Sequence, residues 1–207
     1  MGRPLISLED VLAVSPGGTL AVPPGALITP LAQDAITERG IQLVETAGPA
    51  QPRDASPGVV AIGADHGGFS MKEDLKSFLR ELGYSINDVG AYSEEAVDYP
   101  DFAYAVARQV AQGEAWRGIL VDGAGIGSCM AANKVPGVRA AMCYNEATAI
   151  NSREHNNANV LTLGSKMLEP YQARQIVQIW LATGFGGGRH ARRVDKIMDI
   201  ERRYLKG

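Results

Sequence analysis

The side chains best suited to chemistry in this sequence are its three histidines, His66, His155 and His190, each within a polar cluster. An imidazole changes charge near neutral pH, so it can transfer protons or bind anions. Asp65 precedes His66 and two glycines follow it, so a carboxylate and an imidazole can reach one ligand while the backbone approaches closely. The alternative is a turn that carries these polar residues incidentally.

A second cluster is the glycine loop, residues 122–128, which begins DGAGIG. Glycines at alternate positions can expose a row of backbone N–H groups that stabilises an oxyanion or a phosphate. A tight strand-to-helix turn is the simpler alternative. A dinucleotide loop is a third, supported by Glu146 at the expected distance, but the spacing is G-x-G-x-G rather than G-x-G-x-x-G. Pro136 and Gly137 also interrupt the helix that such a loop should open.

The remaining clusters surround the other two histidines. His155 and Asn156 stand at a predicted helix end, where His155 could act as an acid/base near neutral pH or the pair could simply cap the helix. Arg189 and Arg193 are four residues apart, so on a helix they share a face and suit a phosphate group. A solvated basic face is the alternative for the two arginines.

Alternating strands and helices must position these clusters. Apolar runs predict strands over 58–65, 84–89, 118–122, 138–144 and 159–164. Helical spacing predicts helices over 70–82, 100–112, 145–154, 170–182 and 189–205, the first opened by a capping box of Ser70 and Glu73. This order indicates an α/β fold, a Rossmann-like three-layer domain with a mostly parallel, about five-stranded sheet. Because ligands bind beyond the carboxyl ends of such strands, we expect all the polar clusters there.

The bulk properties limit the classes of function. The 207 residues carry a formal net charge of −3, which gives no general basic field for nucleic acid or anionic lipid, and no apolar run approaches a membrane span. Two cysteines without metal-type spacing favour a reduced, cytoplasmic protein. Three prolines between 47 and 57 predict a linker between an N-terminal extension, 1–46, and the main domain, 58–207. No internal repeat is evident.

Five segments together resemble the B-type ribose-5-phosphate isomerases, whose wider family includes galactose-6-phosphate isomerase subunits. They are GADHGGFSMKEDL at 63–75, DYPDFA at 98–103, GILVDGAGIGSCMAANKVPGVRAA at 118–141, NSREHNNANVLTLGSK at 151–166 and GGRHARRV at 187–194. They occur in the family's order, and the resemblance covers about three quarters of the chain.

The resemblance implies a proton-transfer base in the glycine loop, and here the chain departs from the family. Many members have a cysteine where this chain has Asp122, and others have a glutamate where it has Ser128. Asp122 is the natural substitute, because carboxylates serve as isomerase bases. Cys129 is the second candidate.

The other roles follow from the same resemblance. His155 would open the furanose ring, and Asn156 would bind a substrate hydroxyl. Contacts to the sugar and its phosphate would come from Asp65, His66, Lys166, Arg189 and Arg193. The enediolate oxyanion would lie against Gly123, Ala124, Gly125 and Gly127. The family requires no cofactor and no metal, and its members are homodimers or larger whose active site uses residues of both subunits.

The implied activity is the interconversion of ribose 5-phosphate and ribulose 5-phosphate through an enediol. A tetrose 4-phosphate or hexose 6-phosphate isomerase is the alternative, and a non-catalytic sugar-phosphate-binding protein is another, since the family base is missing. Residues 1–46 contain a Pro-Pro turn, a predicted helix over 30–39 ended by Gly40, and the strand-like IQLV. They resemble short segments of bacterial microcompartment enzymes, which implies docking to a microcompartment scaffold. A structural or oligomerisation role is the alternative.

Overall fold

The computed structural model describes residues 5–23, 26–45 and 58–205 of the chain. The chain divides into two compact units, Met1–Ser56 and Pro57–Gly207. The expected linker over 47–57 lies outside the described residues, as does part of the Pro-Pro turn.

A five-stranded sheet forms the centre of the second unit, in the order β6-β5-β7-β9-β8. Its strands are β5 (Val59–Ala64), β6 (Ser85–Asp88), β7 (Arg117–Asp122), β8 (Ala140–Met142) and β9 (Val160–Gly164). Every pairing is parallel. The structure therefore confirms the Rossmann-like α/β fold, with a sheet that is wholly rather than mostly parallel.

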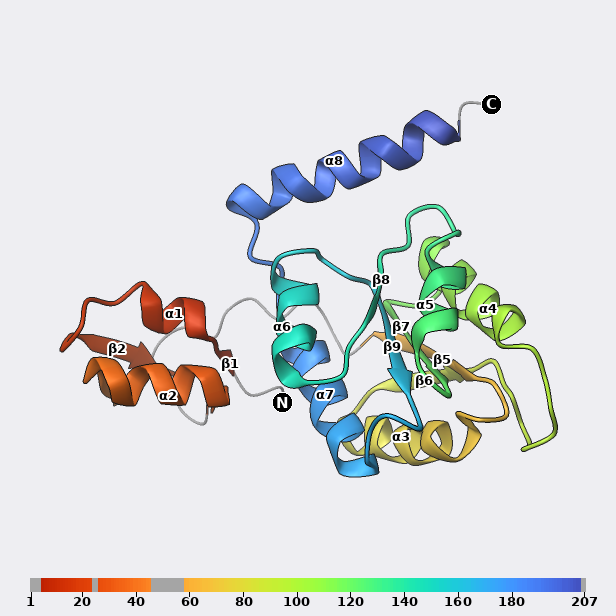
Figure 1. Cartoon of the computed structure of the whole chain (residues 1–207), viewed down its shortest axis with the longest axis horizontal. Helices are drawn as coiled ribbons and strands as arrows, with labels where there is room; N and C mark the ends of the chain where they lie inside the picture. Colours follow the sequence, from red (N-terminus) through yellow and green to blue (C-terminus); the bar gives the residue numbers. More distant parts are fainter. Residues whose placement is uncertain (1–4, 24–25, 46–57, 206–207) are drawn as a thin grey trace. The chain divides into compact units, whose positions relative to one another are not determined.

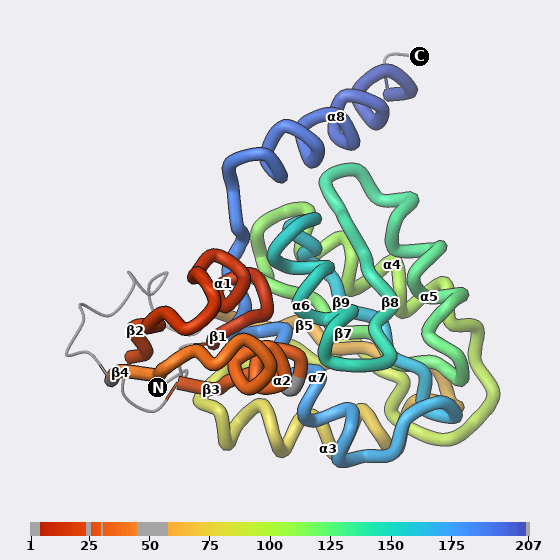
Figure 2. The backbone as a smooth tube through the Cα atoms, turned by 60° about the vertical axis from the view of Figure 1, so that its left-hand side comes forward, coloured from red at the N-terminus to blue at the C-terminus, as the bar shows by residue number. Residues whose placement is uncertain are grey.

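Helices cover both faces of this sheet (Figure 1). They are α3 (Phe69–Glu81), α4 (Tyr99–Ala111), α5 (Ile126–Ala132), α6 (Glu146–Glu154) and α7 (Pro170–Ala182), whereas the last helix, α8 (Gly188–Tyr204), stands away from the sheet. On one face α4 packs against α5, and on the other α7 packs against both α3 and α6. Figure 2 shows the same layers from a second direction, with α3 and α7 side by side. The ends predicted for the helix over 170–182 agree with those of α7.

The strands are buried because helices lie over both sides, which explains why they read as continuous apolar runs. Residues 60–64 of β5 and 118–122 of β7 are all buried. Between the sheet and the α4–α5 layer lies a core of small and branched side chains: Ala61, Ala103, Val106, Ala107, Leu120, Ala132 and Val160. This packing holds the ends of β5 and β7, and hence the loops that follow them, in a rigid frame.

The start of α3 differs from the capping box expected at Ser70 and Glu73. The helix begins at Phe69 with Gly68 as its N-cap, and no side chain caps it. A Cβ on Gly68 would lie 2.2 Å from the carbonyl oxygen of Val121. Only glycine therefore fits where the chain passes the end of β7. Glu73 pairs instead with Lys72 and Lys76.

The first unit is an interlaced repeat, although no repeat was expected from the sequence. Its elements are β1 (Leu5–Ile6), α1 (Leu8–Leu12), β2 (Thr19–Val22), β3 (Leu27–Ile28), α2 (Pro30–Arg39) and β4 (Gln42–Glu45). The two β-α-β halves pair with each other: β1 with β3 and β2 with β4, both parallel. Ser7 and Thr29 cap the corresponding helices. The helices differ in length, five residues against ten, which hides the repeat in the sequence.

Candidate active site

Three loops converge beyond the carboxyl ends of β5, β7 and β9. They are the Asp-His-Gly-Gly loop at 65–68, the glycine loop at 122–128 and the turn at 165–167. The hydroxyl of Ser165 donates to the carbonyl oxygen of Gly67 at 2.7 Å. The backbone N–H of Lys166 donates to the carbonyl oxygen of Gly123 at 3.0 Å. The structure thus brings together Asp65, His66, the glycine loop and Lys166, as the sequence predicted.

Asp122, the base expected from the sequence, lies at this edge with its carboxylate turned into its own loop. Oδ1 accepts hydrogen bonds from the backbone N–H groups of Ala124, at 2.8 Å, and Gly125. Oδ2 accepts from the backbone N–H of Ser128 at 2.9 Å, and the Ser128 hydroxyl donates to the same carboxylate. Burial raises the pKa of this carboxyl, but these hydrogen bonds outweigh burial, so its pKa lies below the ordinary value. The side chain is therefore ionised at neutral pH and only 5% exposed.

Asp65 and His66 are more open. Asp65 is half-buried, and its Oδ1 accepts the N–H of Gly68 at 2.9 Å. His66 is exposed, and its Nδ1 lies 3.2 Å from the carbonyl oxygen of Val97 and 3.3 Å from its nitrogen. The loop before α4 therefore sets the orientation of the imidazole ring.

Cys129, the second candidate base, is placed away from this edge. Its Sγ lies 3.4 Å from the carbonyl oxygen of Ala140, which pairs with Val160 at the start of β9. Asp122 pairs with Gly164 at the other end of that strand. The position of Cys129 does not suit a base that works at the carboxyl edge.

His155 and Asn156 belong to a separate cluster at the end of α6. The amide Nδ2 of Asn151 lies 2.9 Å from Nδ1 of His155, and the amide of Asn156 donates to Asn151. With Asn151 donating to Nδ1, the neutral imidazole carries its proton on Nε2. The ring also stacks on that of His190, with 4.1 Å between centroids. These contacts fix the orientation and the tautomer of the His155 ring.

The expectation that all polar clusters lie at the carboxyl edge is wrong for this group. Because α6 and α7 run back across the sheet, His155, Asn156, Arg189 and Arg193 come at its amino edge, before β9 or after α7. A five-residue strand spans roughly 17 Å, which separates the two groups within one chain. Arg189 and Arg193 are exposed in the first half of α8.

Two supporting residues were missed in the sequence. Asn151 lies one helical turn before His155, a spacing that brings two side chains together and could have been noticed. Ser165 has no such local signal, because its bond to Gly67 joins positions 98 residues apart. Within the described residues of the second unit, no three His, Cys, Asp or Glu side chains come close enough to hold a metal ion.

The fold and the site define an α/β protein with polar loops at both edges of a parallel sheet. The model of the ribose/galactose isomerase family matches residues 60–197. The chain is 44% identical over 144 residues to ribose-5-phosphate isomerase B of Escherichia coli, covering 70% of this chain and 97% of that protein. It is 39% identical over 142 residues to D-erythrulose-4-phosphate isomerase of Pectobacterium atrosepticum, covering 67% and 91%.

The fold comparison agrees. The solved structure of Clostridium thermocellum ribose-5-phosphate isomerase B matches with a TM-score of 0.70 at 49% identity, covering 70% of this chain and 99% of that one. The chain belongs to the ribose/galactose isomerase family. No helix among the described residues combines the length and apolar character that a membrane span needs.

Proposed function

We propose that this protein is an aldose–ketose isomerase that interconverts ribose 5-phosphate and ribulose 5-phosphate through an enediol intermediate. The observation that carries the proposal is the convergence of Asp65, His66, the glycine loop and Lys166 at one sheet edge. The chain that carries them is 44% identical to ribose-5-phosphate isomerase B of Escherichia coli. Such a reaction needs ring opening, proton transfer between C1 and C2, and stabilisation of an oxyanion.

The residues of the two edges divide this work. His155 protonates the ring oxygen and opens the furanose, while Asn156 binds a substrate hydroxyl. Arg189, Arg193, His66 and Lys166 bind the phosphate, and its binding energy positions the sugar. Within the glycine loop, the N–H groups of Gly123 and Gly127 face the enediolate oxygens, since those of Ala124 and Gly125 donate to Asp122.

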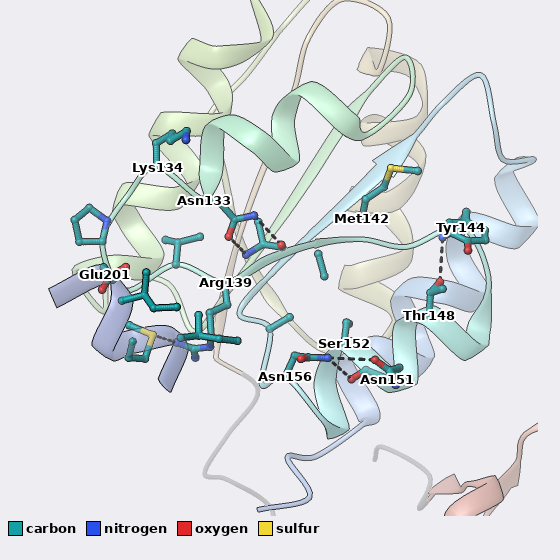
Figure 3. Close-up of a pocket in the computed structure, with 18 of the residues that line it drawn as sticks. Asn133, Lys134, Arg139, Met142, Tyr144, Thr148, Asn151, Ser152, Asn156 and Glu201 are labelled. Atoms are coloured by element: carbon teal, nitrogen blue, oxygen red, sulfur yellow. Dashed lines mark hydrogen bonds between the residues drawn. The ribbon is translucent and has the colours of Figure 1, made fainter. Parts of the chain in front are cut away.

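The separation of the two edges requires a second subunit, so we propose a homodimer in which the carboxyl edge of one chain meets the amino edge of the other. A groove of about 1150 Å³ runs between residues 133–158 and the last turns of α8 (Figure 3). Ile197 and Ile200 of α8 border it and are about half exposed. A second copy covering this apolar surface would complete both sites.

Mixing two inactive variants tests the shared site. Lys166→Ala damages only the carboxyl edge and His155→Ala only the amino edge. In an equal mixture half of the dimers are hybrids with one intact site, so activity should recover to about a quarter of the wild-type value. No recovery after subunit exchange would show that each site belongs to one chain.

The substrate is tested by an isomerase assay over phosphorylated aldoses and ketoses of four, five and six carbons. Ribose 5-phosphate should have the highest kcat/KM. A tetrose 4-phosphate is the second candidate, because the Pectobacterium relative is named for that class. Failure of every sugar phosphate, with measurable binding, would favour a non-catalytic binding protein.

We further propose that the first unit docks the cytoplasmic enzyme to a scaffold, inside a bacterial microcompartment. Support comes from its resemblance to segments of microcompartment enzymes and from its separate core, which includes Val11, Val22, Ala32 and Ile36. Co-purification of the full chain with shell proteins, lost when residues 1–46 are removed, is the expected result.

A further inference from the structure

Two carboxylates stand at the ends of neighbouring strands, where the family base is absent. Asp65 follows β5 and Asp122 ends β7, and the two strands pair directly. The N–H of Asp65 donates to the carbonyl oxygen of Val121 at 3.2 Å, so the two residues lie at adjacent strand ends. Their surroundings differ in a way that separates a structural carboxylate from a reactive one.

The carboxylate of Asp122 is fully occupied. A carboxylate has about four lone-pair positions. Three backbone N–H groups already donate to Asp122, two to Oδ1 and one to Oδ2, and the Ser128 hydroxyl donates to the same carboxylate. A base needs a lone pair directed at the substrate carbon, and Asp122 has none to offer without losing a bond that shapes its loop.

Asp65 has the opposite arrangement. Oδ1 is held by the N–H of Gly68, which fixes the orientation of the carboxylate. Its second oxygen, Oδ2, has no hydrogen-bond partner within residues 5–23, 26–45 and 58–205. A Cβ built on Gly67 would lie 3.4 Å from Oδ1 of Asp65 and 3.8 Å from the nitrogen of Gly123, so this carboxylate borders the glycine loop.

We propose that Asp65 carries the proton between C1 and C2, and that Asp122 is a positioning residue that holds the glycine loop in shape. The proposal rests on the isomerase function proposed above. It gives the missing family base a replacement on the neighbouring strand rather than at the same position.

The step balances without a co-reactant. Oδ2 of Asp65 removes the proton from C2 of the open-chain aldose, the C–H electron pair forms the C1=C2 bond, and the carbonyl pair moves to O1. A proton passes from O2 to O1. Asp65 then returns its proton to C1 while the pair on O2 forms the new carbonyl, which restores the carboxylate.

Two isosteric variants separate the roles, Asp65→Asn and Asp122→Asn. An asparagine at 65 keeps an oxygen for the Gly68 N–H, so the fold should be unchanged. An amide at 122 turns an NH₂ group toward a backbone N–H donor, so the loop should loosen. The measurements are deuterium uptake into the sugar in D₂O, kcat, KM and melting temperature.

If the proposal holds, Asp65→Asn loses at least about a hundredfold in kcat and in deuterium uptake, with its melting temperature unchanged. Asp122→Asn melts at a lower temperature and has a raised KM, but still exchanges the C2 proton. Normal exchange in Asp65→Asn overturns the proposal. A wild-type protein that isomerises no sugar phosphate would instead refute the proposed function.

Ser128→Ala decides the case in which both asparagine variants lose exchange. Removing the hydroxyl takes one hydrogen bond from Asp122 and raises the pKa of its carboxyl. If Asp122 were the base, the acid limb of kcat against pH would move to higher pH, which overturns the proposal. An unmoved acid limb supports Asp65.

Discussion

At the scale of single residues, the neighbours of His155 fix its imidazole ring in place. Asn151 holds Nδ1, and the His190 ring stacks on the imidazole. The ring is therefore fixed in orientation and tautomer, which would lower the cost of reaching the reactive geometry in the proposed ring opening.

His155→Ala should reduce the rate with ribose 5-phosphate about a hundredfold, since a positioned acid contributes on this scale. A tetrose 4-phosphate has no hydroxyl available to close a furanose, so its rate should change little. Initial rates with the two aldoses measure the difference. An equal loss of rate with both aldoses would show that His155 does not act in ring opening.

The arginines of α8 lead to a second prediction. Arg189→Ala or Arg193→Ala should raise KM for the sugar phosphate about tenfold or more, because a charge-assisted hydrogen bond contributes about 1.5–3 kcal/mol. Inhibition by inorganic phosphate should weaken in parallel. Arg192→Ala is the matched control, an exposed neighbour outside the predicted clamp, and should behave as wild type. A proportional loss with unphosphorylated ribose would indicate a folding defect.

The site could be predicted in part because its residues are unusual types in polar clusters, such as Asp65-His66 and Arg189-His190. What could not be predicted is how the side chains are used. The three backbone hydrogen bonds that hold Asp122 depend on the path of residues 124–128, and sequence spacing alone does not reveal which N–H groups turn inward.

At the scale of elements, a buried ion cluster connects α3 to β6. Lys72 has no exposed surface, and its Nζ lies 2.8 Å from Asp88 and 2.6 Å from Glu73. Asp88 also accepts the N–H of Gly90, whose carbonyl oxygen accepts the N–H of Ala64. The cluster therefore supports the end of β5, immediately before Asp65.

Lys72→Met should lower the free energy of unfolding by about 3 kcal/mol, as expected when one partner of a buried ion pair is removed. Lys76→Met is the matched comparison and should cost less, because that side chain is 14% exposed. Urea unfolding at pH 7 measures both. A loss below that of Lys76→Met would contradict the structural role of Lys72.

The loss of unfolding free energy in Lys72→Met should depend on pH. Burial raises the pKa of Asp88, but hydrogen bonds from Lys72, Lys76 and Gly90 lower it below the ordinary 3.8. A carboxyl whose pKa is lower in the folded state stabilises that state fully above the pKa of the unfolded state. This stabilisation is lost as the pH falls through the pKa of the folded state. The effect of Lys72→Met should therefore shrink below about pH 4.

Element prediction succeeded where apolar periodicity was long, as in α7, and failed where tertiary contact decided the boundary. The helix at 69–81 begins at Phe69 because its N-cap, Gly68, passes close to Val121, and not because Ser70 caps it. The short strands of the first unit, two residues each in β1 and β3, carry too few side chains to show a period.

At the scale of the whole molecule, the two units have separate cores, and all the candidate site residues lie in the second. A protein that begins at Ser56 should fold, dimerise and isomerise sugar phosphates at close to the full-length rate. It should lose higher assembly or scaffold attachment. Light scattering alongside the assay separates these properties. An insoluble or inactive product would make residues 1–55 part of the catalytic fold.

The interlaced repeat of the first unit has a consequence for how chains can associate. Each of its two ladders joins one half to the other, so neither half can satisfy its strands alone. The first half of one chain can instead pair with the second half of another, and reciprocally, without losing a strand pair. Such domain swapping would link two enzyme molecules, and the segment between Val22 and Leu27 would be the connection that crosses from one swapped unit to the other.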